Sequence, residues 1–429
     1  MSGAAGVRAA ELVARLARGG REAEAYEKRG RSRRIERGPD GEVASTSIEA
    51  GWAVRCGDLR RSFFASGTGE LPQDGAWPEP TAHPLWLPER RPVAAWSAPA
   101  GLDAPLASES EARSLLDALE RELGREAPGT RLLAARVEEG SSEAVVASSR
   151  GVAARVESRV ASLRLEAERG GARVTAEVAA RELREVRPAA LARRIADRIL
   201  ALDGAETART GPNLLAAPLA ARLIEALAPG LVGREASSSA APLGGVGARL
   251  GADGVALVDD GALADGLLSA PVDGEGVPCG PVRLVEAGRF ARPLVAWWEA
   301  ERAEEARGCA RRASYRDLPR RAPTHLYLEP DATIPVADLL AGIGSGNYLL
   351  DAEGGVRVDP ASGRFAVAVS GFALDGGRAV GGLGRRWLAG DLRGWLCGMR
   401  ARGRDLGFVA GDGMFGSPTL LVEGLELSG

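Results

Sequence analysis

The chain has 429 residues, of which 45% are hydrophobic and 26% charged, a composition that excludes disordered, collagen-like and coiled-coil classes. Its 55 basic and 58 acidic residues leave a formal charge of −3, without the positive excess that a nucleic-acid surface requires. We therefore expect no direct nucleic-acid partner. The length predicts two or three domains rather than one.

Lys28 is the only lysine among the 55 basic residues, and arginine supplies all the others. This bias admits two interpretations, codon usage or an arginine-rich binding surface. The arginines alternate with Glu and Asp along the chain, as they do on ordinary solvated faces. The pattern therefore favours codon usage.

The cysteines form no C-x-x-C pair, which argues against a disulfide framework and a zinc ribbon and favours a reducing compartment. They are Cys56, Cys279, Cys309 and Cys397. Charged residues interrupt the first twenty positions, so these do not form a secretory signal. A transit peptide fits that segment, but Leu12, Val13 and Leu16 at helical spacing favour an amphipathic first helix. No segment is apolar enough to span a membrane, and we expect a cytoplasmic protein.

Elements of the first half alternate between strands and helices. Patterns from Glu22 to Ser66, broken by glycine, predict a small sheet, and the proline-rich segment from Leu71 to Pro99 predicts an irregular loop. Ser108 caps a predicted helix. Residues 131–186 then show four patterns typical of an antiparallel meander with one wet face, and residues 190–204 predict a closing helix.

Glycine, threonine and proline cluster after this helix, and we place the main domain boundary there. The chain beyond it holds short apolar runs separated by glycine turns, which predict a β-rich domain. The fold class is therefore α+β: an N-terminal α/β domain with an antiparallel sheet over residues 1–204, followed by a β-rich C-terminal domain over residues 205–429.

Few residues are available for acid–base chemistry. His83 and His325 are the only histidines, and the apolar run around His325 favours a strand histidine satisfied by hydrogen bonds. Asp273 and Glu275 stand two residues apart in SAPVDGEGVP. They can serve as metal ligands or as acid and base, while the surrounding Gly and Pro residues equally fit a tight turn capped by Asp.

Several segments of the second half resemble, in order, the C-terminal domain of the TldD/PmbA family. They are SAPVDGEGVPCGPVRLVEAGRFARPLVAWW, THLYLEP, VRVDPASGRFAVAVSG and the terminal SPTLLVEGLELSG. They resemble the family's D-x-E-G turn, its N-L-Y-L-E-P-like strand, its V-N-P-x-T-G-x-F-like segment followed by S-G, and its S-P-x-L-L-like end. Residues 22–66 resemble the family's first module and residues 131–198 are compatible with its middle module. The resemblance implies the family's fold and an intracellular peptidase system.

TldD-type members are zinc metallopeptidases with an H-E-x-x-x-H helix, in which two imidazoles hold zinc and the glutamate acts as general base. The corresponding helix here resembles RLIEALAPGL, residues 222–231. Ile224 stands in place of the first histidine and Pro229 in place of the second, so only Glu225 remains. No H-E pair occurs anywhere in the chain. We expect no catalytic residue, cofactor or metal ligand in this chain.

The resemblance is therefore closer to the TldE (PmbA) type, which lacks the zinc motif and pairs with a TldD-like catalytic subunit that carries the zinc. It implies a heterodimer acting on unfolded or leader-type peptides. The alternative is a homodimeric peptide-binding or adaptor protein without a proteolytic role. The family's label as a modulator of DNA gyrase gives a third interpretation, and the acidic charge balance disfavours direct DNA binding.

Overall fold

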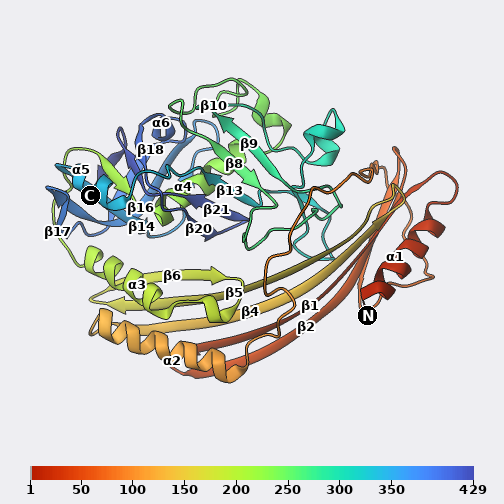
Figure 1. Cartoon of the computed structure of the whole chain (residues 1–429), viewed down its shortest axis with the longest axis horizontal. Coiled ribbons are helices and arrows are strands. Elements are labelled where there is room, and N and C mark those ends of the chain that lie inside the picture. Colours follow the sequence, from red (N-terminus) through yellow and green to blue (C-terminus); the bar gives the residue numbers. More distant parts are fainter. Residues whose placement is uncertain (1) are drawn as a thin grey trace.

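The computed structural model describes residues 2–429. Its N-terminal part is one antiparallel six-stranded sheet in the order β3-β2-β1-β4-β5-β6. The strands are β1 (Glu22–Gly38), β2 (Gly41–Gly57), β3 (Ser62–Thr68), β4 (Arg131–Ser148), β5 (Ala153–Arg169) and β6 (Ala172–Ala180). Figure 1 shows that this sheet is strongly curved, with the C-terminal part of the chain over its concave face.

The strands predicted over residues 22–66 and those of the predicted meander belong to one sheet. β1 pairs with β4 over a register that runs from Glu24↔Ser148 to Arg37↔Ala135, so both groups of strands form a single sheet. Two of the four predicted meander patterns are also one strand, because β4 passes through Gly140 without a break. Gly140 lies against Ser32 of β1, where a glycine fits the close approach of two strands.

Three helices cover the convex face: α1 (Ser2–Leu16), α2 (Glu109–Glu126) and α3 (Pro188–Leu202). α2 begins at the predicted cap, where Ser108 and Glu111 form a capping box. Its apolar stripe, with that of α3, packs against Ile35 and Leu163 of the sheet. The burial of that stripe, rather than helix propensity alone, fixes the helices on this face.

The C-terminal half, residues 213–429, contains a second six-stranded sheet in the order β10-β9-β8-β13-β21-β20 and a nine-stranded sheet. The first comprises β8 (Leu257–Asp260), β9 (Pro281–Glu286), β10 (Arg289–Phe290), β13 (His325–Leu328), β20 (Gly407–Ala410) and β21 (Met414–Ser417). The second comprises β7 (Asn213–Leu215), β14 (Ser345–Ala352), β15 (Arg357–Val358), β16 (Arg364–Asp375), β17 (Arg378–Gly382), β18 (Arg386–Asp391), β19 (Met399–Arg402), β22 (Leu420–Val422) and β23 (Glu426–Ser428). A separate pair consists of β11 (Ala310–Arg311) and β12 (Arg320–Arg321).

Helix α4 (Ala217–Leu227) contributes to the main core of this half with Leu219, Leu223, Ile224 and Leu227. It lies against strands of both sheets, β14 and β21 among them. Two short helices, α5 (Val336–Gly342) and α6 (Gly394–Cys397), lie farther along the chain. The α+β class, with an antiparallel N-terminal sheet followed by a β-rich part, is confirmed by this architecture.

The segment between β3 and α2, residues 69–108, contains no helix or extended strand, as the proline density predicts. Its tryptophans attach it to the rest of the molecule. Trp77 stacks on Phe63 with ring centroids 5.8 Å apart, and Trp86 lies 5.4 Å from Trp297. This segment therefore connects the sheet with the C-terminal half.

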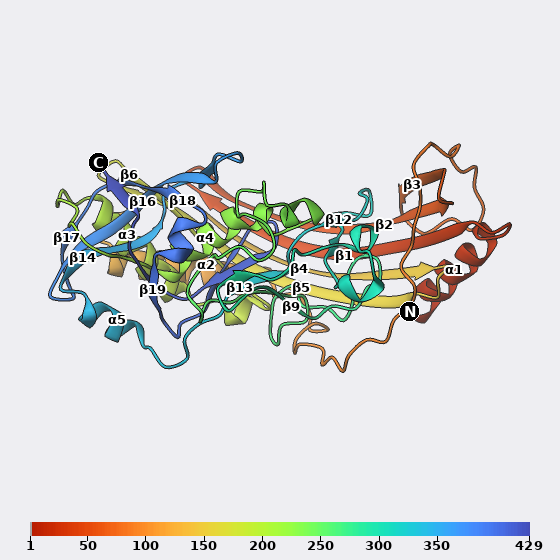
Figure 2. The ribbon, with the colours of Figure 1, turned by 90° about the horizontal axis from the view of Figure 1, so that it is seen from above.

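Buried charges also join the two parts where the C-terminal half meets the concave face. Arg55 of β2 is hydrogen-bonded to Glu24 of β1 and, at 2.6 Å, to Glu275 of the C-terminal half. Arg312 forms a further ion pair with Glu24. Seen from above, the strands of the sheet run beneath the C-terminal half for much of their length (Figure 2).

Candidate functional site

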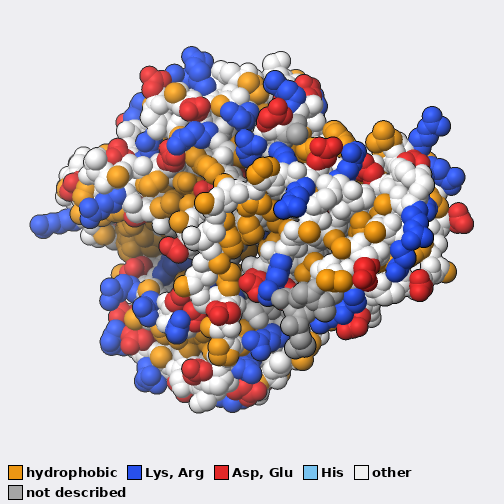
Figure 3. Space-filling model, turned by 45° about the vertical axis from the view of Figure 1, so that its right-hand side comes forward, with side chains coloured by type: hydrophobic (Ala, Val, Ile, Leu, Met, Phe, Trp, Pro, Cys, Tyr) orange, Lys and Arg blue, Asp and Glu red, His pale blue; other side chains and the backbone are white. Residues whose placement is uncertain are grey.

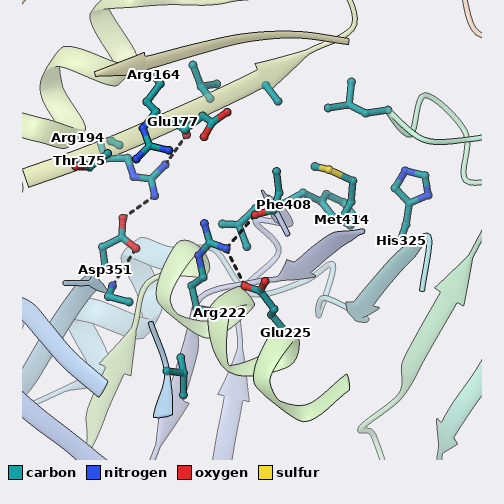
Figure 4. Close-up of a pocket in the computed structure, with 18 of the residues that line it drawn as sticks. Arg164, Thr175, Glu177, Arg194, Arg222, Glu225, His325, Asp351, Phe408 and Met414 are labelled. Atoms are coloured by element: carbon teal, nitrogen blue, oxygen red, sulfur yellow. Dashed lines mark hydrogen bonds and ion pairs between the residues drawn. The ribbon is translucent and has the colours of Figure 1, made fainter. Parts of the chain in front are cut away.

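A cleft of about 850 Å³ lies between the sheet and the C-terminal half. One wall is formed by β5, β6 and α3, and the other by α4, β20 and β21. A loop of residues 262–269, here called the roof loop, closes one end. Figure 3 shows apolar side chains gathered in the hollow between the two parts, and Figure 4 shows charged side chains entering the cleft from both walls.

Two strands line the cleft with consecutive residues. Residues 175–179 of β6 and residues 408–410 of β20 all contribute, and each of these strands is the last one of its sheet. Consecutive lining residues are expected where an edge, rather than a face, borders a cavity, because neighbouring side chains point to opposite faces. The cleft is therefore bordered by two strand edges.

Arginines from α3 already occupy backbone groups of β6. Arg198 donates to the carbonyl of Thr175 at 2.6 Å, and Arg194 donates to the carbonyl of Glu177. On the opposite wall, Arg222 donates to the carbonyl of Ala410 in β20 at 3.0 Å. The β20 edge thus has one carbonyl engaged, against two on the β6 edge.

Glu225 projects from α4 into the cleft, where Arg222 binds its carboxylate at 2.7 Å (Figure 4). Ile224 points the other way and is fully buried in the core of the C-terminal half. Pro229 lies in a short 3-10 turn after α4. Glu225, the one residue of the motif that remains, thus lies in the cleft, but with a guanidinium group beside it.

These residues do not fit the zinc site that the TldD-type motif implies. Isoleucine and proline offer no ligand atom, and the glutamate already has a cationic partner. Among residues 2–429, no group of three or more His, Cys, Asp or Glu side chains has an arrangement able to hold a metal ion.

His325 lines the cleft, but both ring nitrogens are engaged. Nδ1 lies 2.8 Å from the carbonyl of Asp260, and Nε2 accepts from the backbone N–H of Leu268 at 3.2 Å. Burial lowers the pKa of His325 to about 4, so the ring is neutral near pH 7. These contacts hold the roof loop on β13 and leave no free nitrogen for acid–base catalysis.

The remaining charges of the cleft fall into two groups. Arg194 and Asp351 form an ion pair at 2.6 Å. Arg164 of β5 and Glu177 of β6 are cross-strand neighbours, and both are exposed toward the cleft (Figure 4). The sequence did not indicate Arg164 or Phe408 as site residues, because the fold alone brings β5, α4 and β20 together.

Asp273 and Glu275 lie outside the cleft. The carboxylate of Asp273 accepts the backbone N–H groups of Glu275, Val277 and Ala310, and burial raises its pKa to about 7. Glu275 is buried against Arg55. The geometry is that of an Asp-capped turn, with Glu275 directed at the N-terminal sheet.

The four cysteines are free thiols, and of these Cys279 lies close enough to Cys309 to act on its pKa. Cys56 and Cys309 are buried, Cys279 is half-buried and Cys397 is exposed. Burial raises the pKa of Cys56, Cys279 and Cys309, so these three are poor nucleophiles near neutral pH.

A family model described as the PmbA/TldA metallopeptidase C-terminal domain matches residues 208–429, just over half of the chain. The protein therefore belongs to the TldD/PmbA metallopeptidase family. No match was found among curated protein sequences.

Solved structures of similar proteins share the fold over nearly the whole chain. TldE from Thermococcus kodakarensis is 18% identical with a TM-score of 0.82, over 95% of this chain and 97% of that one. A candidate modulator of DNA gyrase from Thermotoga maritima is 17% identical with a TM-score of 0.83, over 97% and 98%. A second candidate gyrase modulator, from Bacteroides thetaiotaomicron, is 17% identical with a TM-score of 0.72, over 99% and 98%.

No helix in the described chain, residues 2–429, is both long and apolar enough to cross a bilayer.

Proposed function

We propose that this chain is the TldE-like subunit of a two-component intracellular zinc metallopeptidase. It binds extended segments of unfolded or leader-type peptides in the cleft, and a TldD-like partner that carries the H-E-x-x-x-H motif cuts them. Membership of the family supports the peptidase context. The observation that carries the non-catalytic role is the pairing of Glu225 with Arg222 in a helix that has no zinc ligands.

The strand edges of the cleft support peptide binding. An extended peptide can add to an exposed edge through main-chain hydrogen bonds, which recognise the backbone of many different sequences. The β20 edge is the better candidate, because arginines occupy two carbonyls of β6. The ring of Phe408 in β20, beside Tyr327 at 5.9 Å, supplies an apolar contact for a peptide side chain.

The first experiment is co-expression of this chain with the relative that carries the H-E-x-x-x-H motif, followed by purification and casein cleavage by each chain alone and by the pair. We expect a stable complex, zinc in the partner, and cleavage only by the pair. Cleavage by this chain alone would contradict the proposal. A homodimer that never binds the relative would favour the peptide-binding alternative.

A second experiment tests the cleft itself. Thr175→Trp on β6 and Ala226→Trp on α4 each place a large ring in the cleft, and Leu200→Trp on the exposed face of α3 is the matched control. We expect each cleft variant to weaken binding of a fluorescent unstructured casein peptide by about tenfold or more, with no change in the control. Equal binding by all three would exclude the cleft as the peptide site.

A further inference from the structure

A second, smaller cavity of about 240 Å³ lies where the C-terminal half meets the concave face of the sheet. We call it the interface cavity. The sheet contributes Lys28 of β1, Ser142 of β4 and Ser158 of β5, and the C-terminal half contributes Arg311, Arg312 and Thr324. It shares no lining residue with the cleft.

Three cationic side chains line this cavity, and their charges are incompletely balanced. Within residues 2–429, Lys28 has neither an ion pair nor a side-chain hydrogen bond. Arg311 donates to the Thr324 hydroxyl at 3.2 Å and has no ion pair among the same residues. Burial lowers the pKa of Arg311, as expected for a guanidinium group without a close counter-ion.

Arg312 is the most deeply buried of the three, with its side chain 1% exposed. It donates to the carbonyl of Gly274 at 3.0 Å and pairs with Glu24. Its Nη1 atom is buried and has no acceptor in the described chain. A buried donor without an acceptor costs free energy, and most native proteins satisfy such groups.

The nearby carboxylates do not pair with Lys28 or Arg311. Asp273 lines the cavity, but its oxygens accept three backbone N–H groups. Asp259 interacts with Arg311 only from beyond ion-pair distance. Its carboxylate accepts a hydrogen bond from the backbone N–H of Thr324, and burial raises its pKa to about 7. Glu24 and Glu275 together balance Arg55 and Arg312. Glu157 also lines the cavity, but its carboxylate pairs with Arg155.

Hydroxyl groups also line the interface cavity. Ser142 and Ser158 lie in hydrogen-bond contact at 2.8 Å on the sheet side, and Thr324 lies on the other side next to Arg311. A small oxyanion would accept hydrogen bonds from such groups and also offset the buried positive charge.

We propose that the interface cavity binds a small oxyanion, a phosphate or a carboxylate, through Lys28, Arg311 and Arg312. Because Lys28 comes from the sheet and both arginines from the C-terminal half, the bound anion links the two parts of the chain. The proposal does not depend on peptide binding in the cleft.

The test is isothermal titration of the full chain, in a buffer without competing oxyanions, with inorganic phosphate and separately with succinate. The variants are Lys28→Gln, Arg311→Gln and the charge-preserving Lys28→Arg. The matched control is Arg378→Gln, which removes one exposed positive charge from β17. A parallel thermal melt measures whether each anion raises the Tm.

We expect saturable binding of at least one probe and a raised Tm in its presence. Lys28→Gln and Arg311→Gln should weaken binding by about tenfold or more, since a charge-assisted hydrogen bond is lost, while Lys28→Arg and Arg378→Gln stay within about threefold. Binding of phosphate alone would identify the ligand as a phosphoryl group, and binding of succinate alone would identify it as a carboxylate. Binding of both would show that the cavity recognises the oxyanion chemistry that they share. Should Arg311→Gln fail to fold, Lys28→Gln decides the question. Binding of neither probe, or equal binding by Lys28→Gln and wild type, would overturn the proposal.

Discussion

Arg55 and Glu275, 220 positions apart in sequence, form a buried ion pair at 2.6 Å between the N-terminal sheet and the C-terminal half. Arg55 also holds Glu24. Removing the guanidinium group would therefore leave two buried carboxylates without this partner. Such a loss costs far more than an exposed ion pair contributes.

We expect Arg55→Met to lower the free energy of unfolding by about 3 to 5 kcal/mol. Urea denaturation of the full chain measures it. Arg60→Met removes an exposed arginine three residues beyond β2, and should stay within about 0.5 kcal/mol of wild type. Equal stabilities of the two variants would show that the buried pair contributes nothing.

Gly51 of β2 is a second contact at the same interface. A Cβ atom there would lie 2.2 Å from Cζ of Tyr315, a fully buried ring. Gly51→Ala should displace the ring and cost about 1 to 3 kcal/mol. Gly280→Ala is the control, because its Cβ would meet nothing within 4 Å. A destabilisation no larger than that of the control would mean that the ring moves freely.

The lowered pKa of His325 predicts that the stability of the folded chain depends on pH. Its pKa is about 4 in the folded chain and about 6.5 when unfolded, so the unfolded state binds the proton more tightly. Stability from this group is complete above about pH 6.5 and is lost as the pH falls toward 4, by about 3 kcal/mol in all. Urea melts between these pH values measure the loss.

His325→Gln should remove that part of the slope, and His83→Gln, which changes the only other histidine, should retain it. Comparing the two variants cancels the opposite contributions of Asp259 and Asp273, whose raised pKa values of about 7 favour the folded state at low pH. Identical slopes in both variants would mean that His325 does not titrate in this range.

Glu225 provides a direct test of the division of roles. If this chain is non-catalytic, Glu225→Gln should change casein cleavage by the pair less than about threefold. The equivalent substitution in the partner's H-E-x-x-x-H motif should reduce cleavage by about a hundredfold or more, as expected for loss of a general base. A comparable loss from Glu225→Gln would assign this residue to the reaction.

Local sequence signals predicted most elements and some of their ends. The capping box at Ser108 marked the start of α2, and the proline density identified the irregular segment before it. These features depend on neighbours within a few residues, which is why a pattern can indicate them. The domain boundary between residues 204 and 205 stays a prediction.

Strand pairing and the cleft depend on residues that are far apart in the sequence, so local sequence patterns could not predict them. Gly140 suggested a strand break, but in the fold it permits the contact with Ser32 of β1. Arg164 and Phe408 carried no motif, and only the docking of the two parts places them in one cleft. Glu225 was found through the family resemblance, whereas its partner Arg222 needed the helix geometry.

The pairing of β1 with β4 governs the order in which the chain can assemble during synthesis. β1 and β2 form a local hairpin, but the other edge of β1 must wait for residues 135–148. At about 5 to 20 residues per second, the roughly one hundred intervening residues take on the order of 5 to 20 seconds to emerge. During that interval an unpaired β1 edge is exposed to other chains. A ribosome-associated chaperone that covers this hairpin would therefore raise the yield of folded protein.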